Sequence, residues 1–440
     1  MGVLIIMNFQ LFISVLAIFI IIYLFHYRDI FNPAAIVSAV FIVCSYIAIY
    51  SSERLQLDLS FKAYSLLVLG ILSFCVGNIF VNISYKLRHK SFNRFLETNI
   101  EYIKMYNKKI ILFVSSAFFV IAFISQIGLA LSISGGNLSS LIYAYRMEML
   151  SGSERIPSIV SNMETINYAV GYYALYILIN NYFVEKIFDH SLILLVLYPC
   201  AIGILSGSRG EIIHYFVFSL TIYYYYYLIK KKKKHIDGKL ILKMALIFAG
   251  MFLFFYLIKF TIGRQDQLGI VEYISGHLAS PLKLFDLFVN EKYKSTYWGE
   301  ETFTRILATF MRGSGVDLRY NTYATFRYLN GVSLGNVYTA FRAYYADFGL
   351  IGILIVPFCI SMVASILYSN FRTCVLNQKS IVNKNLFLYA YVSYGLFVMF
   401  YSNQILEYII NISFIKMVII WLFFDYIFIS GKIRIKIGKF

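Results

Sequence analysis

The stretch VLIIMNFQLFISVLAIFIIIYLF, Val3–Phe25, contains no charged side chain and is long enough to cross a lipid bilayer as a helix. Similar apolar runs recur along the chain. Of its 440 residues, 60% are hydrophobic and only 14% are charged, and the mean hydropathy is +0.71. Soluble domains carry about 25% charged residues. A membrane β-barrel would instead show alternating segments of about ten residues. The sequence therefore predicts an all-α polytopic membrane protein.

Eleven apolar runs are expected to be transmembrane helices, although the sixth is short for a full crossing. They are Val3–Phe25, Ala34–Tyr50, Tyr64–Val81, Ile110–Ile133, Ile159–Phe183, Ser191–Leu205, Glu211–Ile229, Leu240–Ile262, Phe348–Tyr368, Leu386–Tyr401 and Ile409–Ile429. In the link between the fourth and fifth runs, Leu141, Ile142, Tyr145 and Met149 have helical spacing. This link is therefore expected to hold a short helix along the membrane surface.

The positions of lysine and arginine predict the orientation, because cytoplasmic links carry an excess of both. Placing the lysine run Lys230–Lys234 in the cytoplasm also puts the basic links 84–109 and 371–384, and the C-terminal tail, on that side. The N-terminus and the links 51–60, 134–158 and 206–210 then lie outside. The net charge of +17 resides mainly in these short links, so nucleic acid is not an expected partner.

The five cysteines lie in or beside apolar runs and form no C-x-x-C pair. Neither a disulfide framework nor a zinc site is therefore predicted. No nucleotide-binding motif and no cluster of metal ligands is evident, so no cofactor and no metal site are expected.

One long polar interval, Gly263–Thr339, separates the eighth and ninth runs and is expected to lie outside. A loop of this length is usually functional or disordered. Because this one is rich in Phe, Tyr and Leu, we expect a folded cap over a site in the membrane. The chain then divides into helices 1–8 (residues 1–262), the large loop (263–340), and helices 9–11 with a basic tail (341–440).

The turn Ser206-Gly-Ser-Arg-Gly210 leads directly into the seventh run. Ser208 and Glu211 have the spacing of a capping box, which would make Glu211 structural. Arg209 stands between nearby glycines at a helix N-terminus, an arrangement that favours phosphate binding. The alternative is an arginine whose head snorkels to the membrane surface. His214, one turn later, is expected to be a structural histidine.

The long interval holds further candidates. Arg305, Arg312 and Arg319 are seven residues apart and would form one stripe on a continuous helix, although Gly313 and Gly315 interrupt the pattern. They could equally form a solvated charged face paired with nearby acids. His277 is a candidate acid or base by residue type alone. Asp347, just after the interval, could be a base or could cap the ninth helix.

At these residues the chain resembles the oligosaccharide repeat-unit polymerases of the Wzy type, which build O-antigen and capsule. The resemblance rests on Gly207-Ser-Arg-Gly210, Asn336-Val-Tyr-Thr339 and Tyr345-Ala-Asp-Phe-Gly349, and on the number of apolar runs and the position of the loop. It implies a glycosyltransferase of the bacterial inner membrane. Such an enzyme transfers a growing glycan from undecaprenyl diphosphate onto the next lipid-linked repeat unit, outside the cytoplasm.

Under this resemblance we expect two sets of site residues. The catalytic set is Arg209, Glu211, His277 and Asp347; the substrate-binding set is Arg264, Arg305, Arg312, Arg319, Asn336, Tyr338 and Tyr345. Arginine suits a lipid diphosphate because it is always charged and can bind phosphate through two N–H groups. The implied partners are the undecaprenyl-diphosphate-linked glycan, membrane lipid, and a chain-length regulator and flippase of the same pathway.

Two other functions remain open. An O-antigen ligase would use the same outer arginines, so the sequence separates it poorly from a polymerase. A flippase or transporter of the lipid-linked unit would tend to show paired halves and broken helices at matching positions. The sequence shows neither feature.

Overall fold

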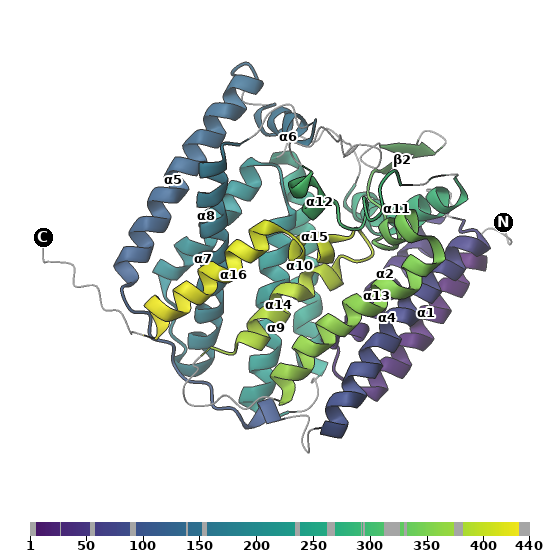
Figure 1. Ribbon diagram of the computed structural model, residues 1–440, viewed down its shortest axis with the longest axis horizontal. Coiled ribbons are helices and arrows are strands. Elements are labelled where there is room, and N and C mark those ends of the chain that lie inside the picture. The colour runs from purple at the N-terminus through teal and green to yellow at the C-terminus, as the bar shows by residue number, and fades with distance from the viewer. Residues whose placement is uncertain are drawn as a thin grey trace, which may run out of the picture.

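The computed structural model describes residues 6–26, 28–52, 58–88, 94–137, 140–151, 156–233, 238–261, 269–291, 293, 295–311, 326–329, 332–373 and 382–430. Within these ranges the chain is largely helical (Figure 1). The long helices are α1 (Ile6–Phe25), α2 (Pro33–Tyr50), α4 (Phe61–Arg88), α5 (Lys108–Ile133), α7 (Ser158–Glu185), α9 (Gly210–Lys231), α10 (Gly238–Thr261), α11 (Ile270–Asn290) and α13 (Phe341–Thr373). The shorter ones are α6 (Leu141–Ser151), α8 (His190–Leu205), α12 (Thr304–Phe310), α14 (Lys384–Phe397), α15 (Gln404–Ile409) and α16 (Ile412–Phe424), with the single turns η1 (Arg94–Glu97) and η2 (Asp425–Ile429).

Within the described ranges, eight helices are long and apolar enough to cross a membrane, which identifies a polytopic membrane protein. They are α1, α2, α4, α5, α9, the Leu242–Lys259 part of α10, α13, and α16 together with η2. The three other predicted runs form α7, α8 and α14. With 16 and 14 residues, α8 and α14 are shorter than the roughly 20 residues of a full crossing. The long α7 carries Asn162, Glu164 and Asn167 in its first half, and these lower its hydropathy.

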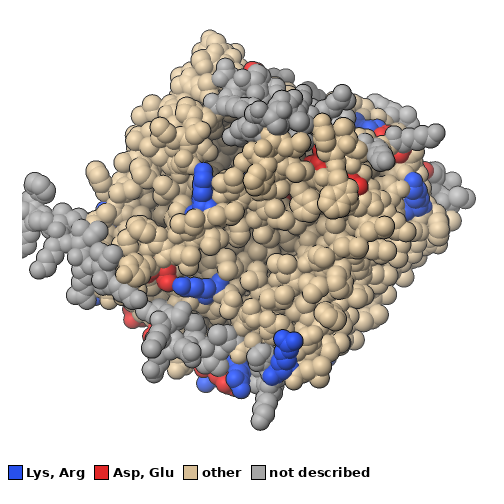
Figure 2. All heavy atoms as spheres, viewed as in Figure 1, with Lys and Arg blue, Asp and Glu red and all other residues tan. Residues whose placement is uncertain are grey.

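The helices pack as three neighbouring groups (Figure 1). On one side α1, α2 and α4 pack together, and α4 also lies along α13. In the middle, α9 packs against α14. On the other side α7 packs against α5 and α8, and α16 crosses it. Figure 2 shows one face of the molecule covered mainly by uncharged side chains, with few lysines, arginines and acids. This composition matches a surface that contacts lipid.

Aromatic side chains form much of the core between α7, α9, α14 and α16. The Tyr172 ring stacks on Tyr215 with centroids 4.1 Å apart, and Tyr391 lies 5.2 Å from Trp421. Buried His214 belongs to this core, since its Nε2 is 2.9 Å from the Tyr391 carbonyl oxygen and its ring stacks on Tyr394. These rings are internal, so an aromatic belt at the membrane surface does not account for them.

A buried ion pair ties the link between α1 and α2 to the rest of the protein. Asp29 pairs with Arg372 of α13, and both side chains are at most 1% exposed. The Asp29 carboxylate also accepts hydrogen bonds from Tyr224 of α9 at 2.9 Å and Tyr368 of α13 at 2.8 Å. This set of donors compensates for removing the charges from water. The link therefore holds α9 and α13 together at this end.

The long polar interval is folded where the structure describes it. It contains α11, the short α12, and an antiparallel hairpin of β1 (Arg327–Leu329) and β2 (Val332–Gly335). α11 buries Tyr273, Leu278, Leu282 and Phe285 and packs on α2. The short helix predicted for the link between the fourth and fifth apolar runs is present as α6. Tertiary packing covers apolar residues of both segments.

Candidate functional site

The candidate site is built around Arg209, which lies in the turn before α9. Gly207 has a positive φ of 66°, which glycine adopts without a steric penalty. The chain then turns into α9, with Arg209 as its N-cap residue and no capping bond from a side chain. The capping box predicted for Ser208 and Glu211 is therefore wrong, because the helix begins one residue later than that box requires. The Glu211 carboxylate instead accepts a hydrogen bond from the Tyr408 hydroxyl at 2.9 Å.

The Arg209 guanidinium lies inside the protein, between α10 and α11. Its Nη1 donates to the Tyr273 hydroxyl at 2.5 Å and to the Phe255 carbonyl oxygen at 3.2 Å. The guanidinium carbon is 3.9 Å from the centroid of the Phe255 ring, a cation–π distance. Arg209 is only 8% exposed. A snorkelling arginine would hold its head in water, so these contacts do not fit that alternative.

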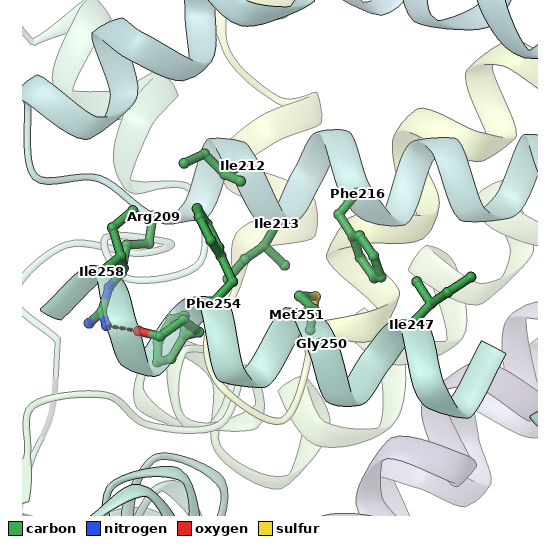
Figure 3. A pocket seen from close by; sticks show the side chains of 10 residues that line it. Arg209, Ile212, Ile213, Phe216, Ile247, Gly250, Met251, Phe254 and Ile258 are labelled. Atoms are coloured by element: carbon green, nitrogen blue, oxygen red, sulfur yellow. Dashed lines mark hydrogen bonds between the residues drawn. The ribbon is translucent and has the colours of Figure 1, made fainter. Parts of the chain in front are cut away.

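An apolar groove leads away from Arg209 between α9 and α10, with a volume of about 290 Å³. Figure 3 shows the side chains of Ile212 and Phe216 from α9 and of Ile247 and Phe254 from α10 along it. Arg209 lies at one end and Ile247 at the other. The groove is therefore apolar along its length and has a cationic end.

His277 and Lys259 approach the same aromatic residues as Arg209. The His277 ring is 4.3 Å from Tyr273 and 5.4 Å from Phe255, measured between centroids. Its Nδ1 lies 2.8 Å from the Tyr273 carbonyl oxygen and must donate, because a carbonyl oxygen only accepts. In the neutral ring the lone pair is then on Nε2. The structure thus brings together Arg209 and His277, two of the predicted catalytic residues, around Tyr273.

A second, polar cleft of about 610 Å³ lies between α12, the link from β2 to α13, and α15. Three predicted substrate-binding residues line it: Arg305, Asn336 and Tyr338. Most of the other lining side chains are uncharged and can form hydrogen bonds, namely Thr304, Thr309, Thr339, Tyr401, Ser402, Asn403, Gln404, Asn411 and Ser413. This lining is suited to a ligand with many hydroxyl groups.

The charged residues that line the cleft form two ion pairs. Arg305 Nε lies 3.6 Å from a Glu407 oxygen, and Arg342 donates to buried Glu301 at 2.6 Å. Burial raises the pKa of Glu301 to about 8, against the opposing charge of Arg342. Burial also raises the pKa of Glu407, and Arg305 again opposes the shift. Burial therefore raises the pKa of both carboxyl groups above the ordinary value, and the paired arginines limit the shift.

The N-terminus of α9 connects the apolar groove to the polar cleft. Arg209 contacts α10 and α11, whereas Glu211 binds the Tyr408 hydroxyl on the opposite side. The Tyr408 ring lies 5.8 Å from the Arg305 guanidinium, which belongs to the cleft. Glu211 therefore contacts the cleft indirectly, through Tyr408.

The remaining predicted residues lie elsewhere. Asp347 is inside α13, and its carboxylate accepts the backbone N–H groups of Glu301 and Thr302, the latter at 2.7 Å. Asp347 therefore binds backbone N–H groups before α12 and does not cap the start of its own helix. These hydrogen bonds hold Glu301 at the cleft. The ring centroid of Tyr345 lies 5.6 Å from the ammonium of Lys62, and Tyr345 does not line the cleft. Arg264, Arg312 and Arg319 lie outside the described residues, so the proposed arginine stripe is not tested; α12 ends at Phe310.

The site also contains residues that sequence reasoning missed. Lys259 falls within the eighth apolar run, where a charged residue is itself a signal of function. Arg342 lies between the motifs Asn336–Thr339 and Tyr345–Gly349, and Glu407 lies in the short link after the tenth run. Nothing local distinguishes Glu407, because its role depends on Arg305, about a hundred residues earlier. Within the described part of the chain, no group of His, Cys, Asp or Glu is arranged to hold a metal ion.

Comparison of the chain with protein-family models, with curated proteins and with solved structures finds no match.

Proposed function

We propose that this protein polymerises oligosaccharide repeat units linked to undecaprenyl diphosphate, at the outer face of the bacterial cytoplasmic membrane. The product would be an O-antigen or capsular polysaccharide. The observation that carries the proposal is the buried guanidinium of Arg209 at the end of an apolar groove between two membrane helices. A substrate with a long isoprenoid tail and an anionic head matches this combination of surfaces.

Each part of the substrate has a complementary part of the site. The isoprenoid chain would lie in the groove beside Phe216 and Phe254, where apolar burial favours it. The diphosphate would contact Arg209 at the start of α9, where the helix dipole also favours an anion. The sugars would occupy the cleft, whose hydroxyl and amide groups can replace their hydrogen bonds to water.

The reaction we propose is a single glycosyl transfer. A hydroxyl oxygen of the acceptor sugar attacks the anomeric carbon of the donor sugar, and the bond from that carbon to the diphosphate breaks. Undecaprenyl diphosphate leaves with the electron pair, stabilised by Arg209. The hydroxyl proton passes to Nε2 of His277, whose tautomer is set by the bond from Nδ1 to Tyr273.

The proposal includes eleven membrane crossings, with α7, α8 and α14 added to the eight apolar helices. It places the N-terminus outside and the C-terminus in the cytoplasm. With this orientation the start of α9, the end of α10 and the cleft all lie at the outer boundary. The lipid-linked substrate reaches this side after export, so the site and the growing polymer would be in the same compartment.

Reconstitution of the purified protein tests the proposal directly. In lipid nanodiscs, given only undecaprenyl-diphosphate-linked repeat units, the protein should make longer lipid-linked glycans without nucleotide. Arg209→Ala should lower the rate by roughly a hundredfold or more, as loss of a key transition-state contact does. Arg209→Lys should keep partial activity, because lysine retains the charge without the planar fork. Gel separation of the fluorescently labelled glycans measures chain length.

The same reconstituted protein distinguishes a polymerase from the two alternatives, a ligase and a flippase. A ligase would leave the repeat units unextended and transfer preformed polymer to a lipid A core when that acceptor is supplied. A flippase would move the lipid-linked unit across a vesicle membrane without lengthening the glycan. Either result, or normal chain growth by Arg209→Ala at equal expression, would overturn the polymerase proposal.

A further inference from the structure

Arg305 and Glu407 form an ion pair in the wall of the polar cleft. They come from α12 and α15, and Arg305 Nε lies 3.6 Å from a Glu407 carboxylate oxygen. Among the lining residues that the structure describes, the other charged ones are Arg342 and Glu301. The side chains of Arg305 and Glu407 are 52% and 24% exposed, whereas those of Arg342 and Glu301 are 9% and 4% exposed. A ligand in the cleft would therefore meet charge mainly at Arg305 and Glu407.

The stability of the protein does not explain why this pair lies in the cleft. Exposed ion pairs contribute little to stability, because water and the entropy of two long side chains offset their attraction. The pair does have a chemical effect on the cleft. The Glu407 carboxylate neutralises the Arg305 guanidinium, and the two groups together present N–H donors and carboxylate acceptors. These are the complements of sugar hydroxyl groups.

An acidic sugar fits this lining less well than a neutral one. A uronate carries a carboxylate where the corresponding hexose has a hydroxymethyl group, and burying a carboxylate is costly unless a cation compensates. In the cleft Glu407 already pairs with Arg305, and Glu301 pairs with Arg342. The added carboxylate would have to displace one of these partners or bind beside it. Juxtaposed like charges are a common means of rejecting a wrong ligand.

We propose that Glu407 is a specificity-determining residue, which makes the cleft select uncharged sugars over acidic sugars such as uronates. This inference rests on the proposed function and assigns the chemical class of the sugars in the repeat unit. Glu407 acts by neutralising Arg305, so that the cleft binds hydroxyl groups in preference to a carboxylate. Without the Glu407 carboxylate, the planar guanidinium of Arg305 would pair with the carboxylate of an acidic sugar.

Equilibrium binding to the protein in nanodiscs tests this proposal. The two probes are undecaprenyl-diphospho-disaccharides that differ only in the second sugar, which is glucose in one and glucuronate in the other. Because the lipid and the diphosphate are the same, the ratio of the two dissociation constants reports the cleft. Wild type should bind the glucose probe about fivefold or more tightly, since Glu407 repels the glucuronate. Glu407→Gln, which keeps the shape and removes the charge, should abolish or reverse this preference.

Two further variants separate the charge of Glu407 from other effects. The double variant Arg305→Gln with Glu407→Gln should again prefer the glucose probe, because neither charge remains to pair with the glucuronate. Asp58→Asn is the matched control. It removes the carboxylate of another ion pair, 2.8 Å from the Lys283 ammonium, and Asp58 does not line the cleft. This control should keep the wild-type ratio.

Each other outcome contradicts a specific part of the proposal. If wild type binds both probes equally or prefers the glucuronate probe, the selectivity is refuted, and growth of lipid-linked glycans in the reconstituted assay would still support the polymerase. If Glu407→Gln keeps the wild-type ratio, Glu407 does not determine the selectivity. If wild type binds neither probe, the proposed function fails as well.

Discussion

The ion pair between Glu301 and Arg342 shows what a single contact does at the rim of the cleft. Both side chains are less than a tenth exposed, and Tyr293 donates a further hydrogen bond to the carboxylate at 3.0 Å. Burial raises the pKa of Glu301 to about 8 from an ordinary value of 4.5, and Arg342 is the main opposing charge. Removing Arg342 would therefore raise this pKa further.

Arg342→Met is expected to destabilise the protein mainly at high pH. A carboxyl group whose pKa is raised by folding contributes stability that is fully present below about 4.5 and is lost as the pH rises through its folded value. At about pH 6 Glu301 is largely protonated and the variant should differ little from wild type. At about pH 9 Glu301 is ionised and paired in wild type, whereas the variant must keep it protonated or ionise it without a partner, so the variant should be less stable by about 1.4 kcal/mol for each pH unit above 8. Thermal unfolding in detergent at both pH values measures the difference.

The control for this prediction is Lys384→Met. It breaks the partly exposed pair of Lys384 with Asp425, 2.9 Å apart, and should cost about 1 kcal/mol or less. A loss of thermal stability in Arg342→Met that is the same at both pH values would contradict the assignment of the effect to Glu301.

Helices α4 and α13 show how small residues set the distance between two membrane helices. A Cβ atom added at Gly77 of α4 would lie 2.6 Å from the carbonyl oxygen of Phe358 in α13. One added at Gly70 would meet the Phe341 ring at the same distance. Between these helices Asn78 also donates to Ser365 at 2.6 Å. Close backbone approach and interhelical hydrogen bonds are the usual means of helix association in a membrane.

Gly77→Ala is therefore expected to separate α4 from α13 and lower the stability by about 1–3 kcal/mol, as overpacking does. Gly128→Ala in α5 is the matched control, because its added Cβ meets nothing within 4 Å and should leave the stability unchanged or slightly higher. Thermal midpoints of the two variants in the same detergent measure the effect. Equal midpoints would mean that the interface between α4 and α13 relaxes without cost.

For the whole molecule, the function proposed above requires the cleft and the lysine run to face opposite sides of the membrane. Lys233 follows α9, and Ser295 follows α11, with α10 as the membrane-crossing helix between them. The distribution of lysine and arginine places Lys233 in the cytoplasm. Ser295 should then lie outside, near the residues that hold Glu301 at the cleft.

Labelling of single cysteines tests this orientation. In a variant without the native cysteines, Ser295→Cys should react with a membrane-impermeant thiol reagent in intact cells. Lys233→Cys should react only after the membrane is permeabilised, which serves as the control for its accessibility. Labelling of Lys233→Cys but not of Ser295→Cys in intact cells would invert the orientation and move the cleft to the cytoplasmic side.

The sequence by itself determined the class of the protein and the approximate location of its long apolar helices. Apolar runs of sufficient length must be membrane helices, because only a helix satisfies its own backbone hydrogen bonds in lipid. Local chemistry also singled out Arg209, which stands between glycines at a helix start, and His277, whose residue type suits proton transfer. Both lie together around Tyr273.

Only the tertiary structure decided which of the other charged residues meet. Glu407 reaches Arg305, Glu301 reaches Arg342, and Lys259 reaches the ring that Arg209 binds, each across many residues of sequence. Helical spacing within one segment carries no information about these pairs, because it describes one helix and not its neighbour. The capping box at Ser208 failed for a related reason. Packing of Gly210 against Tyr394 and of Glu211 against Tyr408 involves distant residues that the local pattern does not contain.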